Sequence, residues 1–179
     1  YQEEAIRQAL ERGYGTIVVG TGGGKTFIMA TLLNNINTGL GKVLIIVPDI
    51  GLVEQTYQDF VSYGIQPQFI SKWTGDNTID LSKNVIIANL GILQSENSDL
   101  SWFAQVNVLF VDECHKLRRG NKVNKLIDKI PTFSRFGFTG TLPEDKLDHW
   151  NIISQIGPVI YEKGTADLRE MGEGQYIAN

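Results

Sequence analysis

Short runs of β-branched apolar residues recur along this chain and indicate its fold class. The strongest runs are residues 16–19, 43–47, 85–88 and 106–111, and weaker candidates are residues 68–70, 135–138 and 158–161. The strong runs are almost continuously apolar instead of alternating with polar residues, which is typical of strands buried on both faces of a parallel sheet. The sequence therefore predicts a mostly parallel central sheet.

Segments of helical length separate the first of these runs. Residues 25–36 and 52–63 carry apolar side chains at helical spacing: Phe27, Ile28, Leu32 and Ile36 in the first, and Leu52, Val53, Tyr57, Phe60 and Val61 in the second. Strand and helix thus alternate, which predicts an α/β fold with helices on both faces of the sheet. The three tryptophans, Trp73, Trp102 and Trp150, are expected to be core or partly buried residues.

The composition of the chain indicates that it can form a core and argues against a membrane helix, an internal disulfide and a structural metal site. With 179 residues, 42% of them apolar, it can bury a core of its own. Its longest uninterrupted apolar run, residues 43–47, is far shorter than the roughly 18 residues that a membrane helix needs. A single cysteine, Cys114, cannot form an internal disulfide, and no Cys/His cluster has the spacing of a structural metal site. We expect a soluble cytoplasmic protein that has no structural metal and no membrane contact.

A glycine-rich segment joins the first strong run to the first helical segment. It reads Gly20-Thr21-Gly22-Gly23-Gly24-Lys25-Thr26. A bound triphosphate needs closely approaching backbone N–H groups, a helix N-terminus, a lysine for its β/γ-phosphates and a hydroxyl for Mg²⁺. The segment supplies all four, although the strict motif has one more glycine where this chain has Val19. We predict ATP binding by Thr21, Gly22, Gly23, Gly24, Lys25 and Thr26, with Thr26 also on Mg²⁺.

Two acidic residues, Asp112 and Glu113, directly follow the run at residues 106–111. Ligands of open α/β sheets lie outside the carboxyl ends of the strands, so these carboxylates should share one edge with the glycine-rich segment. Asp112 is suited to hold Mg²⁺ through its water shell, and Glu113 to orient and deprotonate an attacking water. We predict Lys25, Asp112 and Glu113 as the catalytic residues.

The glycine-rich segment, taken with Asp112-Glu113-Cys114-His115, resembles the N-terminal RecA-like motor domain of superfamily 2 DExH-box helicases. Within that superfamily it is most similar to the restriction-enzyme ResIII and phage UvsW-like group. Tyr1-Gln2 resembles a Q-type motif, and residues 47–55, 87–93 and 138–143 resemble motifs Ia, Ib and III. The resemblance, which covers residues 2–173, implies a RecA-like P-loop NTPase that couples Mg-ATP hydrolysis to movement on DNA or its remodelling.

The same resemblance implies roles for residues outside the phosphate site. Gln2 would read adenine. Three residues, His115, Thr139 and Thr141, would couple the nucleotide state to the grip on a strand. The motif Ia and Ib positions imply nucleic-acid contacts at Pro48, Leu52, Gln55 and Asn89.

Residues 115–129 hold six basic side chains and one acidic one, in a chain whose formal net charge is −4. If this stretch is helical, Val123, Leu126 and Ile127 would face the core. Its basic side chains then form either a solvated face or a set of phosphate contacts, and both alternatives fit the pattern. In the second case Arg118 and Arg119 would contact nucleic acid.

From about residue 164 the glycines Gly164, Gly172 and Gly174 predict a less regular segment. We expect residues 1–164 to form RecA-like domain 1 and residues 165–179 to lead toward a second RecA-like domain that this chain lacks. Superfamily 2 motors close ATP between two such domains, so the chain alone should bind ATP with little turnover. Alternatives are the motor half of a type I or type III restriction-enzyme subunit, an RNA helicase, a P-loop phosphotransferase, or a non-catalytic nucleic-acid-binding module.

Overall fold

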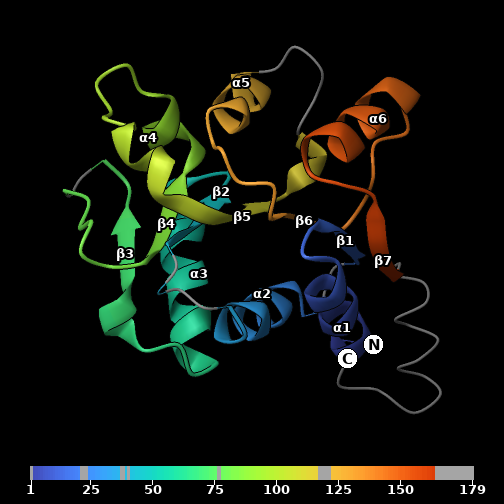
Figure 1. Cartoon of the computed structure of the whole chain (residues 1–179), viewed down its shortest axis with the longest axis horizontal. Coiled ribbons are helices and arrows are strands. Elements are labelled where there is room, and N and C mark those ends of the chain that lie inside the picture. Colours follow the sequence, from blue (N-terminus) through green and yellow to red (C-terminus); the bar gives the residue numbers. More distant parts are fainter. Residues whose placement is uncertain are drawn as a thin grey trace.

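A seven-stranded parallel sheet forms the centre of the molecule, with strand order β3-β4-β2-β5-β6-β1-β7 (Figure 1). The structure, a computed structural model, describes residues 2–20, 24–36, 39, 41–75, 78–116 and 122–163. Its strands are β1 (Gly15–Val19), β2 (Lys42–Val47), β3 (Ile70–Trp73), β4 (Val85–Asn89), β5 (Val106–Asp112), β6 (Arg135–Thr139) and β7 (Val159–Lys163). All neighbouring strands pair in parallel, as the apolar runs predicted.

Helices cover both faces of this sheet, which confirms the α/β fold class (Figure 1). One face carries α1 (Gln2–Arg12), α2 (Lys25–Asn34) and α3 (Ile50–Ser62), and the other carries α4 (Leu90–Gln94), α5 (Lys122–Asp128) and α6 (Lys146–Gln155). Short 3₁₀ turns occupy Pro67–Phe69, Ser101–Gln105 and Cys114–Lys116. Among the described helices, none is long and apolar enough to cross a membrane.

The central strand β2 explains why the apolar runs are continuous. Val43, Ile45 and Val47 pack into the core beneath α1, α2 and α3, whereas Leu44 and Ile46 pack beneath α4, α5 and α6. Successive side chains of a strand point to opposite faces, and here both faces are covered. A polar residue at any of these positions would lose its hydration on burial.

Helix α1 was not predicted, because its buried stripe consists mainly of small side chains. Ala5 and Ala9 are its two fully buried residues. Other helix signals were present: acidic residues in the first turn, Arg12 in the last, and Gly13 directly after it with a φ of 76°. The sequence therefore contained the ends of this helix, although its apolar residues were few and the buried ones among them small.

Two sequence-based expectations are wrong in detail. The weak strand candidate at residues 68–70 is mostly a 3₁₀ turn, Pro67–Phe69, and β3 begins at its last residue, Ile70. Trp150 is 65% exposed, because α6 turns its neighbours Asn151 and Ile152 inward instead. Trp73 and Trp102 are buried as expected, and their rings meet edge to face with centroids 5.9 Å apart.

Gly137 in β6 leaves room for the buried side chain of Cys114. A Cβ atom on residue 137 would lie 2.8 Å from Sγ of Cys114 and 3.2 Å from Cγ2 of Ile156. We expect Gly137→Ala to lower the free energy of unfolding by about 1–3 kcal/mol, measured by urea denaturation. Gly51→Ala is a matched control, because its Cβ would meet no atom of another residue closer than 3.4 Å.

A second substitution tests the cause of that loss. Cys114→Ala removes the sulfur atom that the new methyl group would strike, so the double variant should recover much of the stability that Gly137→Ala loses. Additive losses in the two single variants would show that the Cys114 contact is not responsible.

Candidate active site

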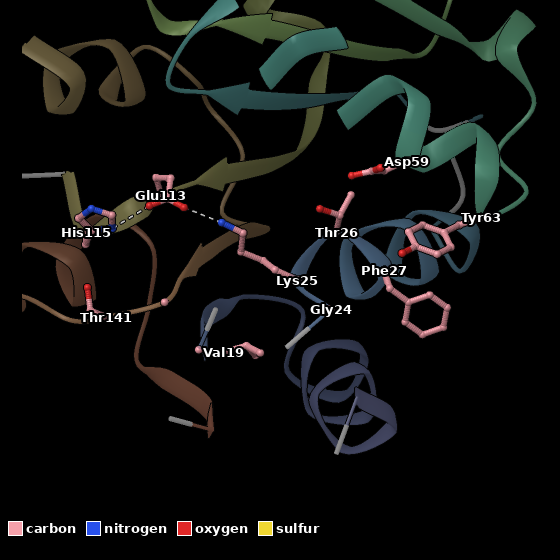
Figure 2. Close-up of a pocket in the computed structure, with 12 residues that line it drawn as sticks. Val19, Gly24, Lys25, Thr26, Phe27, Asp59, Tyr63, Glu113, His115 and Thr141 are labelled. Atoms are coloured by element: carbon pink, nitrogen blue, oxygen red, sulfur yellow. Dashed lines mark hydrogen bonds and ion pairs between the residues drawn. The ribbon is translucent and has the colours of Figure 1, made fainter. Parts of the chain in front are cut away.

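A cavity of about 480 Å³ opens beside the carboxyl ends of β1, β5 and β6 (Figure 2). Its lining comes from the end of β1, the start of α2, the turns after β5 and β6, and helix α3. The lining residues are Val19, Gly20, Gly24, Lys25, Thr26, Phe27, Asp59, Tyr63, Glu113, His115, Gly140 and Thr141. The strands are parallel, so their carboxyl ends meet at one edge, where ligands of open α/β sheets bind. The volume is within the usual range for a small-molecule site.

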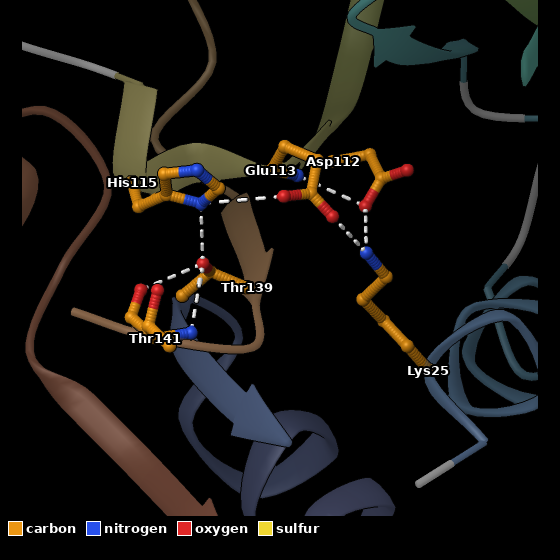
Figure 3. Close-up of polar contacts among 6 residues, drawn as sticks. All are labelled: Lys25, Asp112, Glu113, His115, Thr139 and Thr141. Carbon is orange, nitrogen blue, oxygen red and sulfur yellow. Dashed lines mark hydrogen bonds and ion pairs between the residues drawn. The ribbon is translucent and has the colours of Figure 1, made fainter. Parts of the chain in front are cut away.

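Lys25, the first residue of α2, reaches across this edge to two carboxylates (Figure 3). Its Nζ lies 2.6 Å from Oδ1 of Asp112 and 2.6 Å from Oε1 of Glu113. Burial works against the charged ammonium, but the two carboxylates outweigh it and raise the pKa of Lys25. The lysine therefore stays protonated, and any phosphate entering the cavity would compete with both carboxylates for it.

Glu113 has an unusual backbone conformation. Its φ is 56°, and no other described non-glycine residue has a positive φ. Left-handed backbone costs a side-chain-bearing residue on the order of 1–3 kcal/mol and is concentrated at functional sites. Three contacts hold Glu113 in place: its backbone N–H donates to Oδ1 of Asp112 over 2.9 Å, Oε1 meets Lys25, and Oε2 lies 3.3 Å from Nδ1 of His115.

A hydrogen-bonded chain connects the turn after β5 with the turn after β6 (Figure 3). Nδ1 of His115 lies 2.7 Å from Oγ1 of Thr139, and that hydroxyl donates to the carbonyl oxygen of Thr141 over 2.8 Å. A hydroxyl has one proton, so with that proton on the Thr141 carbonyl, Nδ1 of His115 must be the donor to Thr139. Thr139 itself is fully buried. The structure thus brings together the three residues that the resemblance assigns to coupling.

The donor set at this edge fits a hydrated Mg²⁺. The Thr26 hydroxyl belongs to the cavity lining. Both contacts described above for Asp112 use Oδ1, which leaves Oδ2 for a metal-bound water. Hydroxyl and carboxylate oxygens are ligands that Mg²⁺ prefers. The oxygens of Thr26 and Asp112 therefore have the chemistry that the metal role predicted from the sequence needs. Thr26 lines the 480 Å³ cavity, whereas Asp112 lines a smaller one that also includes Glu113.

Gln2 packs against the glycine-rich segment. A Cβ atom on Gly24, whose φ is 78°, would lie 1.8 Å from Nε2 of Gln2. The backbone conformation at position 24 favours glycine, and a Cβ atom there would also require the end of the flexible Gln2 side chain to move aside. Gln2 is not among the described residues that line the cavity.

Five predicted site residues lie outside the described part of the chain, namely Thr21, Gly22, Gly23, Arg118 and Arg119. Residues 164–179, predicted to lead toward a second domain, also lie outside it. Farther along the basic stretch, α5 buries Val123, Leu126 and Ile127 as predicted. Its basic residues Lys122 and Lys125, and Lys129 after it, are exposed. This arrangement fits both the solvated face and the set of phosphate contacts.

The structure describes four of the six predicted nucleic-acid residues, namely Pro48, Leu52, Gln55 and Asn89. Pro48 lines a second, small cavity together with Asp112 and Glu113. Asn89, at the end of β4, is 5% exposed, and its Oδ1 has no hydrogen-bond partner among the described residues.

Leu52 and Gln55, two more of the predicted nucleic-acid residues, lie on helix α3. The backbone N–H of Leu52 donates to the capping carboxylate of Asp49 over 3.1 Å, and the Gln55 amide donates to Asp59 over 2.9 Å. The carboxyl ends of β2 and β4 thus bring Pro48 and Asn89 to one edge, whereas Gln55 is engaged along its own helix.

Sequence reasoning missed three residues of the cavity. Phe27 follows Thr26 on α2, and Asp59 and Tyr63 lie on or at the end of α3. The rings of Phe27 and Tyr63 meet edge to face, with centroids 5.2 Å apart and an interplanar angle of 79°. Only the packing of α2 against α3 brings the three together, so no local motif could have indicated them.

Comparison with known proteins agrees with this geometry. Residues 1–144 match the family described as the res subunit of type III restriction enzymes, ResIII. The chain is 28% identical over 178 residues to the ATP-dependent DNA helicase uvsW of Enterobacteria phage T4, covering 97% of this chain and 35% of the relative. It is 27% identical over 180 residues to the DNA 3'-5' translocase XPB2 of Sulfurisphaera tokodaii, covering 99% and 37%.

The fold matches as well. The helicase domain of Pyrococcus furiosus Hef superposes with a TM-score of 0.74 at 20% identity, covering 95% of this chain and 39% of that one. The chain spans about a third of the length of the two curated relatives, at 35% and 37%. The chain belongs to the ResIII family of type III restriction enzyme res subunits, and it has the fold of the N-terminal RecA-like motor domain of superfamily 2 helicases.

Proposed function

We propose that this chain binds Mg-ATP in the 480 Å³ cavity and is the first motor domain of an ATP-dependent DNA helicase or translocase. The observation that carries the proposal is the pair of 2.6 Å contacts from Nζ of Lys25 to Asp112 and Glu113, at the carboxyl-terminal edge of a parallel sheet. A lysine at a helix N-terminus beside two strand-end carboxylates supplies the charges that phosphoryl transfer needs. The names of the two sequence relatives support DNA as the partner.

The residues of the site divide the chemistry between them. Lys25 neutralises charge on the β/γ-phosphates and, on binding ATP, releases the carboxylates that it now holds. Thr26 and Asp112 would hold Mg²⁺, which supplies further charge neutralisation when bound. Glu113 orients a water molecule for attack on the γ-phosphate and accepts its proton.

His115, Thr139 and Thr141 provide the proposed link between hydrolysis and strand binding. Oε2 of Glu113 faces the imidazole of His115, which is hydrogen-bonded in turn to Thr139. A change in the position of Glu113 therefore alters a contact of the turn after β6. We assign strand contacts to Pro48, Leu52, Gln55, Asn89, Arg118 and Arg119 in the same proposal.

Efficient hydrolysis is proposed to need a second RecA-like domain. Arginine fingers supplied by a second element are worth about 10³ to 10⁵ in rate. We place residues 1–164 in the first motor domain and residues 165–179 in the exit toward the second.

Two measurements test the proposal. Calorimetric titration should show Mg²⁺-dependent ATP binding by this chain, with very slow hydrolysis, and the full-length protein should hydrolyse ATP faster when DNA is added. A folded chain that binds no ATP would refute the nucleotide site. DNA-stimulated turnover by the chain alone, above that of a Lys25→Ala variant, would refute the need for a second domain.

The family match favours a second candidate, the motor half of a restriction-enzyme subunit. It has the same chemistry at Lys25, Asp112 and Glu113, and it differs in what accompanies the motor. A nuclease motif elsewhere in the full-length protein, together with ATP-dependent DNA cleavage, would decide for this candidate. Duplex remodelling without cleavage would decide for a helicase.

A further inference from the structure

We propose that Cys114 is a positioning residue for the reaction, because the packing of its side chain against β6 holds the acidic turn, residues 112–115, in its working place. This inference rests on the proposed hydrolysis of ATP and adds a residue that lies behind the site. Among residues 112–115, Cys114 is the buried one, with 0% of its surface exposed, whereas the other three are partly exposed.

The acidic turn sends its side chains in two directions. Those of Glu113 and His115 make the contacts described above at the edge of the sheet (Figure 3). Cys114, between them in the sequence, lies instead in the apolar core beneath α4, α5 and α6. The left-handed backbone of Glu113, with a φ of 56°, comes directly before it. Such a backbone persists only where its surroundings hold it, and the buried side chain of the next residue provides that hold.

The space that Cys114 occupies is created by Gly137. A Cβ atom on Gly137 would lie 2.8 Å from Sγ and 3.1 Å from Cβ of Cys114. Gly137 belongs to β6 and pairs with Val111 of β5, so the acidic turn folds back over the neighbouring strand. Close packing leaves no room for an added methyl group there, and removing the sulfur would leave a gap. The position of residue 114 therefore sets the position of Glu113 and His115.

Small displacements of this turn should matter for hydrolysis. The contacts of Glu113 with Lys25 and His115 are made by its side chain, so they do not fix the backbone of the turn. Moving Sγ of Cys114 from 2.8 Å to an ordinary contact distance would require a shift of roughly 0.7 Å or more. A misplacement of about 1 Å, caused by a substitution away from the chemistry, can lower a rate about 10²-fold.

Cysteine labelling measures the packing of Cys114 directly and needs no nucleotide. Cys114 is the only cysteine in the sequence, so a maleimide reports on this side chain alone. Gly137→Ala should be labelled at least about tenfold faster than wild type, at a rate that depends little on low concentrations of urea, which indicates local displacement instead of global unfolding. Gly51→Ala should be labelled like wild type. A wild-type labelling rate in Gly137→Ala would overturn the proposed packing.

ATP hydrolysis by the full-length protein tests the consequence of that packing. Gly137→Ala and Cys114→Ala should each lower kcat about tenfold or more, with ATP affinity within about twofold of wild type. The double variant removes the sulfur atom that the new methyl group would strike, so it should recover most of the lost kcat. A residue that only stabilises the fold would not produce this split between kcat and affinity.

Val106→Ala is the matched control for lost core volume. Val106 lies in the same apolar core as Cys114 but at the other end of β5, away from the acidic turn. Its truncation should lower the free energy of unfolding and leave kcat unchanged. Thermal unfolding of each variant verifies that the protein is folded at the assay temperature.

The possible results are distinct. Wild-type kcat in folded Gly137→Ala and Cys114→Ala would refute the positioning role and leave the proposed function standing. Parallel losses of kcat and ATP affinity, or an equal loss of kcat in Val106→Ala, would indicate general damage and refute the role as well. A wild-type full-length protein that hydrolyses no ATP would refute the proposed function and the positioning role together.

Discussion

Lys25→Ala is expected to lower the affinity of this chain for ATP by about 10²-fold or more, because truncating one partner of a shielded charge pair typically costs 2–5 kcal/mol. Lys25 belongs to the cavity lining, and its Nζ lies 2.6 Å from a carboxylate oxygen of Asp112 and 2.6 Å from one of Glu113. Its side chain is only 23% exposed. Calorimetric titration with ATP in the presence of Mg²⁺ measures the change.

The same substitution leaves Asp112 and Glu113 next to each other without their shared cation. Their mutual repulsion should lower the free energy of unfolding, so circular dichroism and urea denaturation must accompany the titration. Lys146→Ala, at the exposed start of α6, is the matched control for loss of one positive charge. ATP affinity within about twofold of wild type in a folded Lys25→Ala chain would contradict the assignment of Lys25 to phosphate.

Glu113→Gln should lower the rate of ATP hydrolysis by the full-length protein by about 10²- to 10⁴-fold, the usual contribution of a general base. Glutamine has nearly the same shape and can still accept a hydrogen bond from Lys25, but it cannot take up the proton of an attacking water. ATP affinity should therefore change little. A single-turnover assay, with ATP binding measured separately, distinguishes loss of chemistry from loss of binding.

Glu54→Gln is a suitable control for this second substitution, because Glu54 lies on the exposed side of α3 and pairs with Lys72 over 2.9 Å. It should hydrolyse ATP like wild type. If Glu113→Gln instead lost ATP binding and hydrolysis to the same extent, Glu113 would be a structural partner of Lys25 and not the base.

The sheet could be predicted from sequence because its physical cause is local. Strands such as β2 and β5 are covered on both faces, so almost every side chain in them must be apolar, and the run is visible without any knowledge of the rest of the fold. Helix α1 gave no such signal, because Ala5 and Ala9 bury little area compared with a stripe of leucines.

The meeting of Lys25 with Asp112 and Glu113 could be predicted from sequence for a similar reason. The glycine-rich segment and the Asp112–Glu113 pair each follow a strand, and parallel strands deliver their carboxyl ends to one edge. The α3 side of the cavity was not predictable, because Phe27 and Tyr63 meet only through the packing of two helices. The left-handed backbone of Glu113 also had no sequence signal, since glutamate does not favour that region.

The left-handed backbone of Glu113 sets the stability of the chain against the catalytic role that we propose for this residue. Asparagine tolerates a φ near 56° better than glutamate does, so Glu113→Asn should relieve part of the backbone cost. It would also remove the carboxylate that we propose as the general base. Directed evolution of this domain for heat resistance alone would therefore reward variants that lack the proposed base at position 113, and a library screened in that way needs a hydrolysis assay beside it.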